Sequence, residues 1–452
     1  MTVDHRSAWR RRLVAGAVVL SFVAAGCGNS TAKSDTGDDD STTTAAASKT
    51  TSGGDFPAVT APGVTATEIK VGGIASATNP LGASYGSAFD GAQAYFDMVN
   101  ASGGIYGRKL VLAETKDDNA VNNKEAAKAL IESDIFAVLP VDTLLFTGAD
   151  DLVAANVPTF GWTINAEWGG TADAPRSNLF GQSGSYLGIG NGAPSVPYLA
   201  QMLKKHKLGI LAYGVPQSAD CATGIEKSVD KYGKGADVEV AFSDKSLAYG
   251  EKNLSVQVGK MKDAGVDLVT TCMDTNGVVT LATEMDKQGL DVPQYLPNGY
   301  DQTFVKQYGD LFEGSVVRTD FAPFEIDEKD RPKGLAEFLE WMDKSGKDPT
   351  ENAATAWMNA AQFVDGLKAA GPDFDRQKLI DAINAMTDWT GDGMTWGVDW
   401  TRRHTEVDPL DHLCAALSKI EDSAFVPIGD PGKPFTCIDG SDPDKLTATY
   451  SA

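Results

Sequence analysis

The sequence predicts an α/β protein with two lobes, each built on a mainly parallel sheet. From Glu68 onward, short apolar strands alternate with segments whose apolar residues recur at helical spacing. The same alternation starts again near Leu208, which indicates a second lobe of the same kind. Strands that alternate with helices form parallel sheets covered on both faces, with right-handed crossovers.

The first series of elements begins after Thr67 and extends to Trp162. Its strands are expected at 69–74, 110–114, 135–139 and 158–162. Its helices are expected at 85–100, 122–132 and 147–155. The first of these helices carries an apolar stripe and is closed by the pair Gly103 and Gly104, a typical helix stop.

The second series follows a lysine-rich helix expected at 204–207. Its strands are expected at 208–215, 238–242, 266–272 and 295–297, with a return strand at 315–323. Its helices are expected at 223–232, 255–264, 278–287 and 302–311. Three helices without intervening strands then follow at 337–344, 353–370 and 377–386. We expect these to complete the first sheet, so that the chain crosses between the lobes more than once.

The amino terminus predicts export and lipid attachment. Four arginines precede an apolar run at 13–25, and the small residues 24–26 lead to Cys27. The run is shorter than the roughly 20 apolar residues that span a bilayer, so 1–26 is interpreted as a lipoprotein signal peptide with Cys27 as the lipidated residue. Ala24 departs from the large aliphatic that is usual there. Ordinary secretion with a free Cys27 thiol, and twin-arginine export through the basic run, remain alternatives.

The segment after Cys27 has the composition of a disordered tether. Residues 27–62 are dominated by Ser, Thr, Ala, Gly, Lys and Asp, which bury too little surface to offset the entropy of ordering. Without residues 1–26 the net charge changes from -23 to -26, because four arginines and Asp4 are lost. So acidic a surface argues against nucleic acid and against electrostatic docking on anionic lipid. We therefore expect membrane association through the lipid anchor only.

The remaining cysteines are even in number and suit an oxidising compartment. They are Cys221, Cys272, Cys414 and Cys437. Three pairings are possible, and a strand order of 2-1-3-4-5 in the second lobe favours Cys221 with Cys272 because their strands would be neighbours. The other two bracket residues 415–428, which are expected to form a terminal hairpin. Metal binding is the rival interpretation, but no close cysteine pair exists, and neither a metal nor a cofactor is expected.

Several segments together resemble a known family. They are the stretch Gly63–Gly72, Tyr85-Gly86 with Gly91-Ala92, the run Val99–Leu110, Gly299 to Asp301, and Glu313 to Val316. This pattern is similar to leucine/isoleucine/valine-type solute-binding proteins, the receptors of ABC importers with the type 1 periplasmic binding fold. The resemblance covers residues 63–372 well and the last 80 poorly. It implies two Rossmann-like lobes joined by three crossovers, closing on a small ligand without reacting with it.

The resemblance also implies lobe boundaries and a ligand site. Lobe one is expected to comprise 63–193 and 324–391, and lobe two 194–323 and 392–452. In amino-acid binders of the family a serine after the third strand, and hydroxyls and amides after the fourth, hold the ligand carboxylate. Here Asp142 and Thr143 occupy the first place, and Trp162, Thr163 and Asn165 the second. These departures argue against a simple branched-chain amino acid. Trp162 either shapes the pocket or packs beneath the loop.

Lobe two is expected to supply Asp274, Tyr300 and Asp301. Either acid could pair with a ligand ammonium, or it could only cap the helix that follows it, since Asp is a favoured N-cap. Tyr85, on the loop after the first strand, either stacks on the ligand or packs at a helix start. For each of these residues, both ligand contact and a purely structural role stay open.

The function expected from these features is capture of a small polar organic molecule, amino-acid-like, by a monomeric, lipid-anchored extracytoplasmic receptor that delivers it to an ABC permease. A sensor of the same fold that feeds a signalling partner is the alternative of another class. Residues 82–86 match the G-x-S-x-G pattern of serine hydrolases, but residues 77–81 separate it from its strand and no matching histidine follows. Residues 188–192 have the wrong spacing for a dinucleotide site. We therefore expect no enzyme.

Overall fold

The computed structural model describes residues 56–79, 85–170, 173–182, 184, 192–297, 299–404 and 412–452. The expected signal peptide, Cys27, most of the tether, the serine of the G-x-S-x-G pattern and residues 188–191 lie outside these ranges. Across the described ranges, none of the helices combines the length and apolar character needed to cross a membrane.

The first sheet has the strand order β2-β1-β3-β4-β5, and every pairing in it is parallel. Its strands are β1 (Glu68–Ala75), β2 (Lys109–Asp117), β3 (Ala137–Asp142), β4 (Thr159–Gly161) and β5 (Leu179–Gly181). The helices between them are α1 (Ser87–Ala101), α2 (Asn123–Glu132) and α3 (Ala149–Ala154), with a short 3-10 turn η1 (Ala166–Trp168). The expected first series is confirmed, and β5 is an additional strand.

The second sheet repeats the same order and then extends it. From one edge it runs β7-β6-β8-β9-β10 in parallel and continues antiparallel through β11, β13 and β14, with β12 paired to β11. Its parallel strands are β6 (Lys207–Tyr213), β7 (Glu239–Leu247), β8 (Leu268–Cys272), β9 (Gln294–Leu296) and β10 (Val316–Thr319). Its antiparallel strands are β11 (His412–Glu421), β12 (Ala424–Ile428), β13 (Phe435–Asp439) and β14 (Thr447–Ser451). The terminal hairpin is therefore confirmed as β11 and β12.

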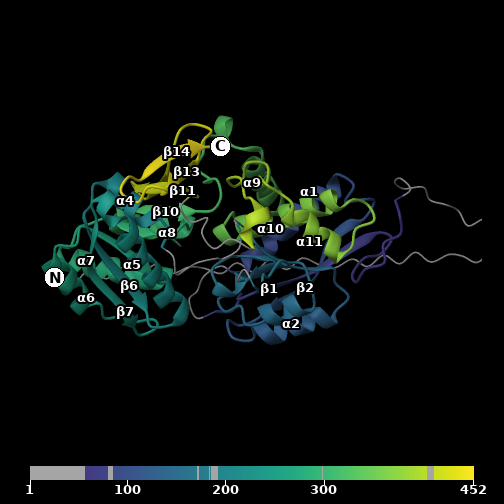
Figure 1. The fold of residues 1–452 in the computed structure, drawn as a ribbon, viewed down its shortest axis with the longest axis horizontal. Helices are drawn as coiled ribbons and strands as arrows, with labels where there is room; N and C mark the ends of the chain where they lie inside the picture. Colours follow the sequence, from purple (N-terminus) through teal and green to yellow (C-terminus); the bar gives the residue numbers. More distant parts are fainter. Residues whose placement is uncertain are drawn as a thin grey trace, which may run out of the picture. The chain divides into compact units, whose positions relative to one another are not determined.

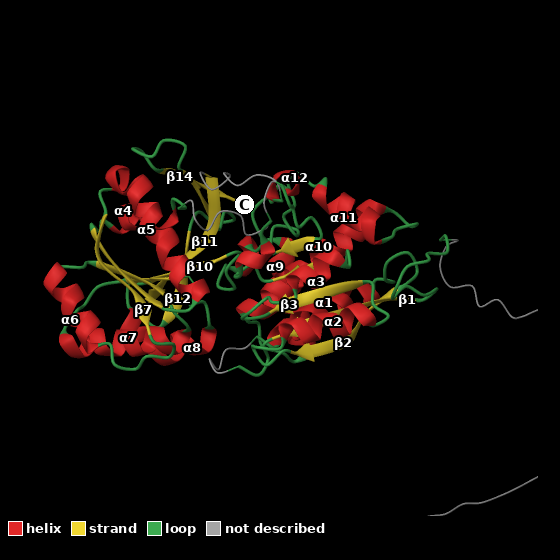
Figure 2. Ribbon diagram, turned by 60° about the horizontal axis from the view of Figure 1, so that its bottom comes forward, coloured by secondary structure: helices red, strands yellow, loops and turns green. Residues whose placement is uncertain are grey.

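Helices cover both faces of the second sheet, as the buried β6 residues require (Figure 2). These helices are α4 (Ser195–Leu203), α5 (Pro216–Ala236), α6 (Ser255–Ala264), α7 (Thr275–Gln288), α8 (Gln302–Tyr308) and the 3-10 turn η2 (Gly309–Phe312). Leu208 and Ile210 of β6 pack in a cluster with α4 and α5, whereas Leu211 and Tyr213 pack with α6 and α7. This alternation follows from the two-residue period of a strand.

The expected lysine-rich helix at 204–207 is wrong. The helix is α4, which ends at Leu203, and Lys204 adopts a left-handed conformation with φ 55° at its C-cap. Lys207 already begins β6. The apolar face that makes the helix lies in residues 196–200, so the lysines mark its end and not its body.

Three later helices return to the first sheet. They are α9 (Lys333–Ser345), α10 (Glu351–Ala370) and α11 (Arg376–Asn384), with η3 (Glu328–Asp330) before them and α12 (Trp400–Arg403) after them. Helices α9 and α10 pack beside α1, although more than 200 residues separate them in the sequence (Figure 1). Asn359 of α10 donates to the carbonyl of Gly161 at 3.3 Å. The chain thus passes from the first sheet to the second, back to the helices over the first, and again to β11.

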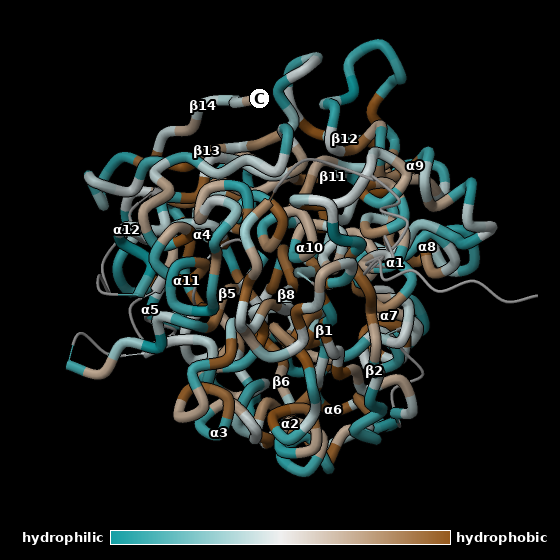
Figure 3. Tube along the Cα trace, turned by 90° about the vertical axis from the view of Figure 1, so that its right-hand side faces the viewer, coloured by the Kyte–Doolittle hydropathy of each residue, from teal (hydrophilic) through white to brown (hydrophobic). Residues whose placement is uncertain are grey.

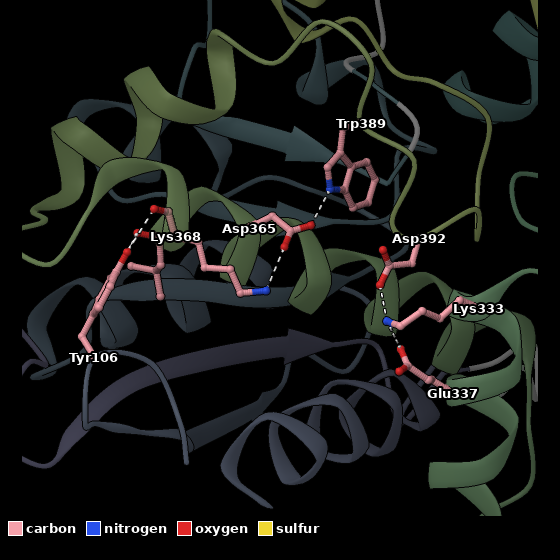
Figure 4. Close-up of polar contacts among 8 residues, drawn as sticks. Tyr106, Lys333, Glu337, Asp365, Lys368, Trp389 and Asp392 are labelled. Atoms are coloured by element: carbon pink, nitrogen blue, oxygen red, sulfur yellow. Dashed lines mark hydrogen bonds and ion pairs between the residues drawn. The ribbon is translucent and has the colours of Figure 1, made fainter. Parts of the chain in front are cut away.

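Polar contacts fasten the segment after α11 to these helices (Figure 4). Trp389 Nε1 donates to Asp365 Oδ2 of α10 at 3.1 Å. Lys333 of α9 contacts Asp392 Oδ2 at 2.5 Å and Glu337 Oε2 at 2.9 Å. The return segment is therefore held from both sides before the chain leaves for the second sheet.

The end of the expected tether also contacts the first lobe. Arg108 Nη2 donates to the carbonyl of Pro57 at 3.0 Å, and the ring of Phe56 lies 5.4 Å from that of Tyr106. Val59 and Ala61 pack against the core. These contacts begin ahead of residue 62, because Phe56 and Val59 supply apolar surface that the preceding Ser/Thr-rich stretch lacks.

Hydrophobic residues concentrate on the inner strands and hydrophilic ones on the outer loops (Figure 3). One large cluster joins α1, β3 and α10 to residues of the second lobe, and smaller clusters lie under α2 and under α5. Both disulfides form as expected, Cys221–Cys272 between α5 and β8 and Cys414–Cys437 between paired positions of β11 and β13.

Candidate functional site

Most of the predicted site residues lie in loops at the carboxyl ends of parallel strands. Tyr85 follows β1, residues 142–143 end β3, and residues 162–165 follow β4. Asp274 follows β8, and residues 300–301 follow β9. In open parallel sheets this is the edge at which ligands bind.

Thr143 belongs to a buried polar network and does not face outward. Its hydroxyl donates to Asp118 Oδ2, while Asp118 Oδ1 accepts from Ser76 Oγ at 2.8 Å. Asn123 Nδ2 donates to the same carboxylate at 3.1 Å. The network holds the loop after β3 against the loop after β1, so we assign Thr143 to the support of the site.

Asn165 fixes the neighbouring loop from within. Its Nδ2 donates to the carbonyl of Leu144 at 2.8 Å, and its side chain is 1 % exposed. The ring of Trp168 lies beneath, and a Cβ on Gly161 would come within 2.6 Å of it. Trp168 is therefore the tryptophan that packs under this loop.

Trp162 is half-buried and lies against Tyr85. The two ring centroids are 5.5 Å apart, with an angle of 47° between the rings. The backbone amide of Trp162 donates to the carbonyl of Val141 at 2.9 Å, which sets the direction of its loop. Trp162 therefore contacts Tyr85, whereas Trp168 lies beneath the loop.

Thr163 is hydrogen-bonded to Gln182, which lies where the chain first leaves the first sheet for the second. Its amide and hydroxyl lie 2.9 Å and 3.1 Å from Gln182 Oε1, and Gln182 Nε2 donates to Asp320 Oδ2 at 2.9 Å. The amide and hydroxyl that would hold a ligand carboxylate in the family pattern thus bind Gln182 instead. Gln182 was not expected from the sequence, since no motif marks it.

Asp142 is a buried acid at the end of β3. Its Oδ2 accepts from Asn352 Nδ2 at 2.9 Å, while Oδ1 has no hydrogen-bond partner among the described residues. Burial, and then the nearby charge of Asp118, raise the pKa of Asp142 well above its usual value, although the Asn352 hydrogen bond opposes this. Glu351, the next residue to Asn352, also has a raised pKa, through burial and the charges of Asp320 and Asp142.

Asp274 caps α7 and also accepts a second hydrogen bond. Its Oδ2 accepts from the amide of Asn276 at 3.2 Å, which confirms the capping interpretation. Its Oδ1 accepts from the hydroxyl of Tyr213 at 2.5 Å. Tyr213 ends β6 and its ring packs against Tyr249, with ring centroids 5.2 Å apart and an angle of 59° between the rings. Both tyrosines were missed, although Tyr213 ends a strand at the edge where ligands bind.

Tyr300 and Asp301 have different structural roles, the first in the core and the second at a helix N-cap. The Tyr300 hydroxyl donates to Glu325 Oε2 at 2.7 Å and accepts from the amide of Phe324 at 2.7 Å, and its ring packs edge-on against that of Phe324. Tyr300 is therefore packed in the core, with 2 % of its side chain exposed. Asp301 Oδ1 accepts from the amide of Phe304 at 2.6 Å and so caps α8.

Groups of the two lobes act on one another at these strand ends. Gln217 Nε2, at the start of α5, donates to the carbonyl of Leu144 at 3.3 Å. Burial raises the pKa of Tyr85, and the charges of Asp142, Tyr249, Glu351 and Asp274 raise it further. Tyr85 of the first lobe therefore lies in the electrostatic field of Asp274 and Tyr249 of the second.

The described residues enclose cavities that include two of very different size. One of about 10 Å³, room for a single water, is lined by residues on both sides of Asp274, among them Met273, Thr275 and Gly299. A larger one of about 260 Å³ lies between residues 325–330 and the loop before β13. Within the described ranges, no group of three or more His, Cys, Asp or Glu side chains is placed to hold a metal ion.

The repeated 2-1-3-4-5 sheets, the three crossings and the facing strand ends define a two-lobed binding protein of the type 1 periplasmic fold. The chain belongs to the periplasmic binding protein family, whose model matches residues 68–411. This confirms the resemblance seen in the sequence. No curated protein sequence matches the chain significantly.

Solved structures share the fold at low sequence identity. A branched-chain amino acid ABC transporter from Thermus thermophilus with bound valine has a TM-score of 0.65 and 15% identity, over 81% of this chain and 96% of that one. A fatty acid ABC transporter substrate-binding protein from Thermomonospora curvata has a TM-score of 0.63 and 17% identity, over 87% and 94%. A solute-binding protein from R. palustris in complex with 4-hydroxybenzoate has a TM-score of 0.60 and 18% identity, over 80% and 95%.

Proposed function

We propose that this protein is an extracytoplasmic solute-binding protein, anchored by lipid on Cys27, that delivers a small polar organic ligand to an ABC permease. The ligand is amino-acid-like in polarity, and the protein performs no reaction on it. Membership of the periplasmic binding protein family supports capture of a solute. The basic and apolar leader before Cys27 supports the anchor.

The observation that carries the proposal is the set of side chains at the strand ends of both sheets. Tyr85 and Trp162 come from the first lobe, and Tyr213, Tyr249 and Asp274 from the second. Proteins of similar structure hold ligands as different as valine and 4-hydroxybenzoate. The ligand class must therefore be inferred from this chain's own residues.

A thermal-shift screen over amino acids, amides, ureas and aromatic acids tests solute capture. A ligand at 100 times its dissociation constant stabilises the folded state by roughly 2.7 kcal/mol, which raises the melting temperature measurably. We expect Asp274→Asn to abolish or reduce the shift. The matched control is Asp291→Asn, since Asp291 is exposed and precedes β9 at the opposite edge of the sheet. Equal shifts in both variants would place the site elsewhere.

The anchor has a separate test. Detergent-phase partitioning of membranes from cells that express the full chain should recover the protein with the lipid phase, and Cys27→Ala should move it to the aqueous phase. If the substitution leaves the partition unchanged, Cys27 is not the lipidated residue.

A further inference from the structure

Two aromatic pairs stand at the strand ends, one on each lobe. Tyr85 and Trp162 pack with ring centroids 5.5 Å apart, and Tyr213 and Tyr249 with centroids 5.2 Å apart. In both pairs the rings are tilted, at 47° and 59°, so that the two rings of a pair present faces in different directions. Such an arrangement provides π faces on more than one side of a bound group.

Asp274 contacts one pair directly and acts electrostatically on Tyr85 of the other. Tyr213 donates its hydroxyl hydrogen to Asp274 Oδ1 at 2.5 Å, which fixes both the ring and the carboxylate. The negative charge of Asp274 reaches all three tyrosines, since it contributes to the raised pKa of Tyr85, Tyr213 and Tyr249 after the larger effect of burial. Asp274 thus acts on the three tyrosines, and Trp162 packs against one of them, Tyr85. We call these four rings and the Asp274 carboxylate the aromatic cluster.

The surroundings of the aromatic cluster are acidic. Asp142 and Glu351 also act on Tyr85, and every charge that shifts these three tyrosines is negative. The positive charge of Arg318 acts on Glu351, but its guanidinium already pairs with Asp320 at 2.6 Å. An anionic ligand would meet uncompensated repulsion here, and a neutral apolar one would desolvate Asp274 without a partner.

We propose, resting on the solute-binding function above, that the aromatic cluster binds an alkylated ammonium group of the ligand. Such a group spreads its charge over methyl carbons and has few or no N–H donors, so ring faces suit it better than hydrogen-bond acceptors do. Aromatic rings attract a cation through their quadrupole, by about 0.5–1 kcal/mol when exposed and about 2 when desolvated. Tyr85 and Tyr213 are 6 % and 3 % exposed, which places their rings in the desolvated regime.

Tyr249 is the position at which to test the aromatic cluster. Its side chain is 48 % exposed, so its loss removes little of the core, and it lies on the loop after β7. Tyr249→Ala removes the ring, whereas Tyr249→Phe keeps the π face and loses only the hydroxyl. The control Tyr450→Ala removes a tyrosine of 36 % exposure from β14.

The experiment is calorimetric titration of the purified protein with choline and with its uncharged isostere 3,3-dimethylbutan-1-ol. We expect choline to bind at least tenfold more tightly than the isostere. Tyr249→Ala should weaken choline at least tenfold, while Tyr249→Phe and Tyr450→Ala should stay within threefold of the original chain. Equal binding of the two probes, or equal loss in Tyr249→Ala and Tyr450→Ala, would overturn the proposal.

The same titration separates this inference from the proposed function. If choline does not bind but valine or 4-hydroxybenzoate does, and Asp274→Asn weakens that binding, the solute-binding function stands and the ammonium inference is wrong. If no solute binds the original chain under any condition of the screen, both are wrong.

Discussion

The two lobes build the same strand order and fix the same loop by different chemistry. The loop after the third strand of the first lobe is held by the Asp118 network of hydrogen bonds. The loop after the third strand of the second lobe is held by the Cys221–Cys272 disulfide, beside which Ser218 Oγ donates to the carbonyl of Cys272. Both loops carry proposed site residues. Each lobe therefore stabilises the loop at this strand end, the first with a hydrogen-bond network and the second with a disulfide. The comparison indicates that both loops are held in a fixed conformation.

The largest effect should come from the disulfide of the second lobe. Replacing Cys221 and Cys272 by alanine opens a link across 51 residues and should lower the free energy of unfolding by about 4 kcal/mol in the chain-entropy model. The same change at Cys414 and Cys437, which are 23 residues apart, should cost about 3 kcal/mol. Denaturant unfolding monitored by tryptophan fluorescence measures both. A smaller loss at Cys221 and Cys272 than at the other pair would contradict the stated role of loop length.

The next effect should come from the polar network of the first lobe. Asp118→Ala leaves the buried donors of Ser76, Asn123 and Thr143 without their acceptor and should cost about 3 kcal/mol. Asp117→Ala is the matched control, because the Asp117 carboxylate accepts from exposed backbone amides, and it should cost less than about 1 kcal/mol. If the urea unfolding curves of the two variants coincide, the network does not hold the loop.

Tyr300→Phe should distinguish a role in core stability from a role in ligand binding. It leaves the buried amide of Phe324 unpaired and removes the donor to Glu325, so we expect a loss of about 2 kcal/mol in the free energy of unfolding. Ligand affinity should stay unchanged within twofold by calorimetric titration. A large loss of ligand affinity without loss of stability would show that Tyr300 contacts the ligand.

The smallest expected effect concerns Asp142 in the first lobe. Its folded-state pKa lies well above its ordinary 3.8, so the carboxyl binds protons more tightly when folded than when unfolded. Its contribution to stability is therefore present below pH 3.8 and is lost as the pH rises through the folded-state pKa. Asp142→Asn should be about 1 kcal/mol more stable than the original chain at pH 7. That advantage should shrink as the pH falls toward 4, in unfolding curves at matched ionic strength; an advantage that grows on acidification would contradict the burial.

The fold could be predicted from the sequence because strand and helix periodicities alternate along it. The same reasoning gave both disulfides, since Cys221 and Cys272 follow strands that are neighbours in a 2-1-3-4-5 sheet. The lysines 204–207 do not form the expected helix, because the apolar stripe that packs the helix lies just before them, in residues 196–200.

The site could be predicted only as a set of loops. Strand ends identified the right edge, but which side chain turns outward depends on contacts between distant residues. Thr143 points into the Asp118 network and Thr163 toward Gln182, and no local pattern marks either partner. Tyr249 was missed because it follows the second strand of its lobe, a place that the family pattern does not emphasise.

We propose that one ligand contacts both lobes at their strand ends. Calorimetric titration of the ligand found in the thermal-shift screen, with Tyr85→Ala for the first lobe and Asp274→Asn for the second, tests it most directly. Each substitution alone should weaken binding at least tenfold, equivalent to about 1.4 kcal/mol. An affinity that falls with only one of the two substitutions, and is unchanged by the other, would contradict a shared site.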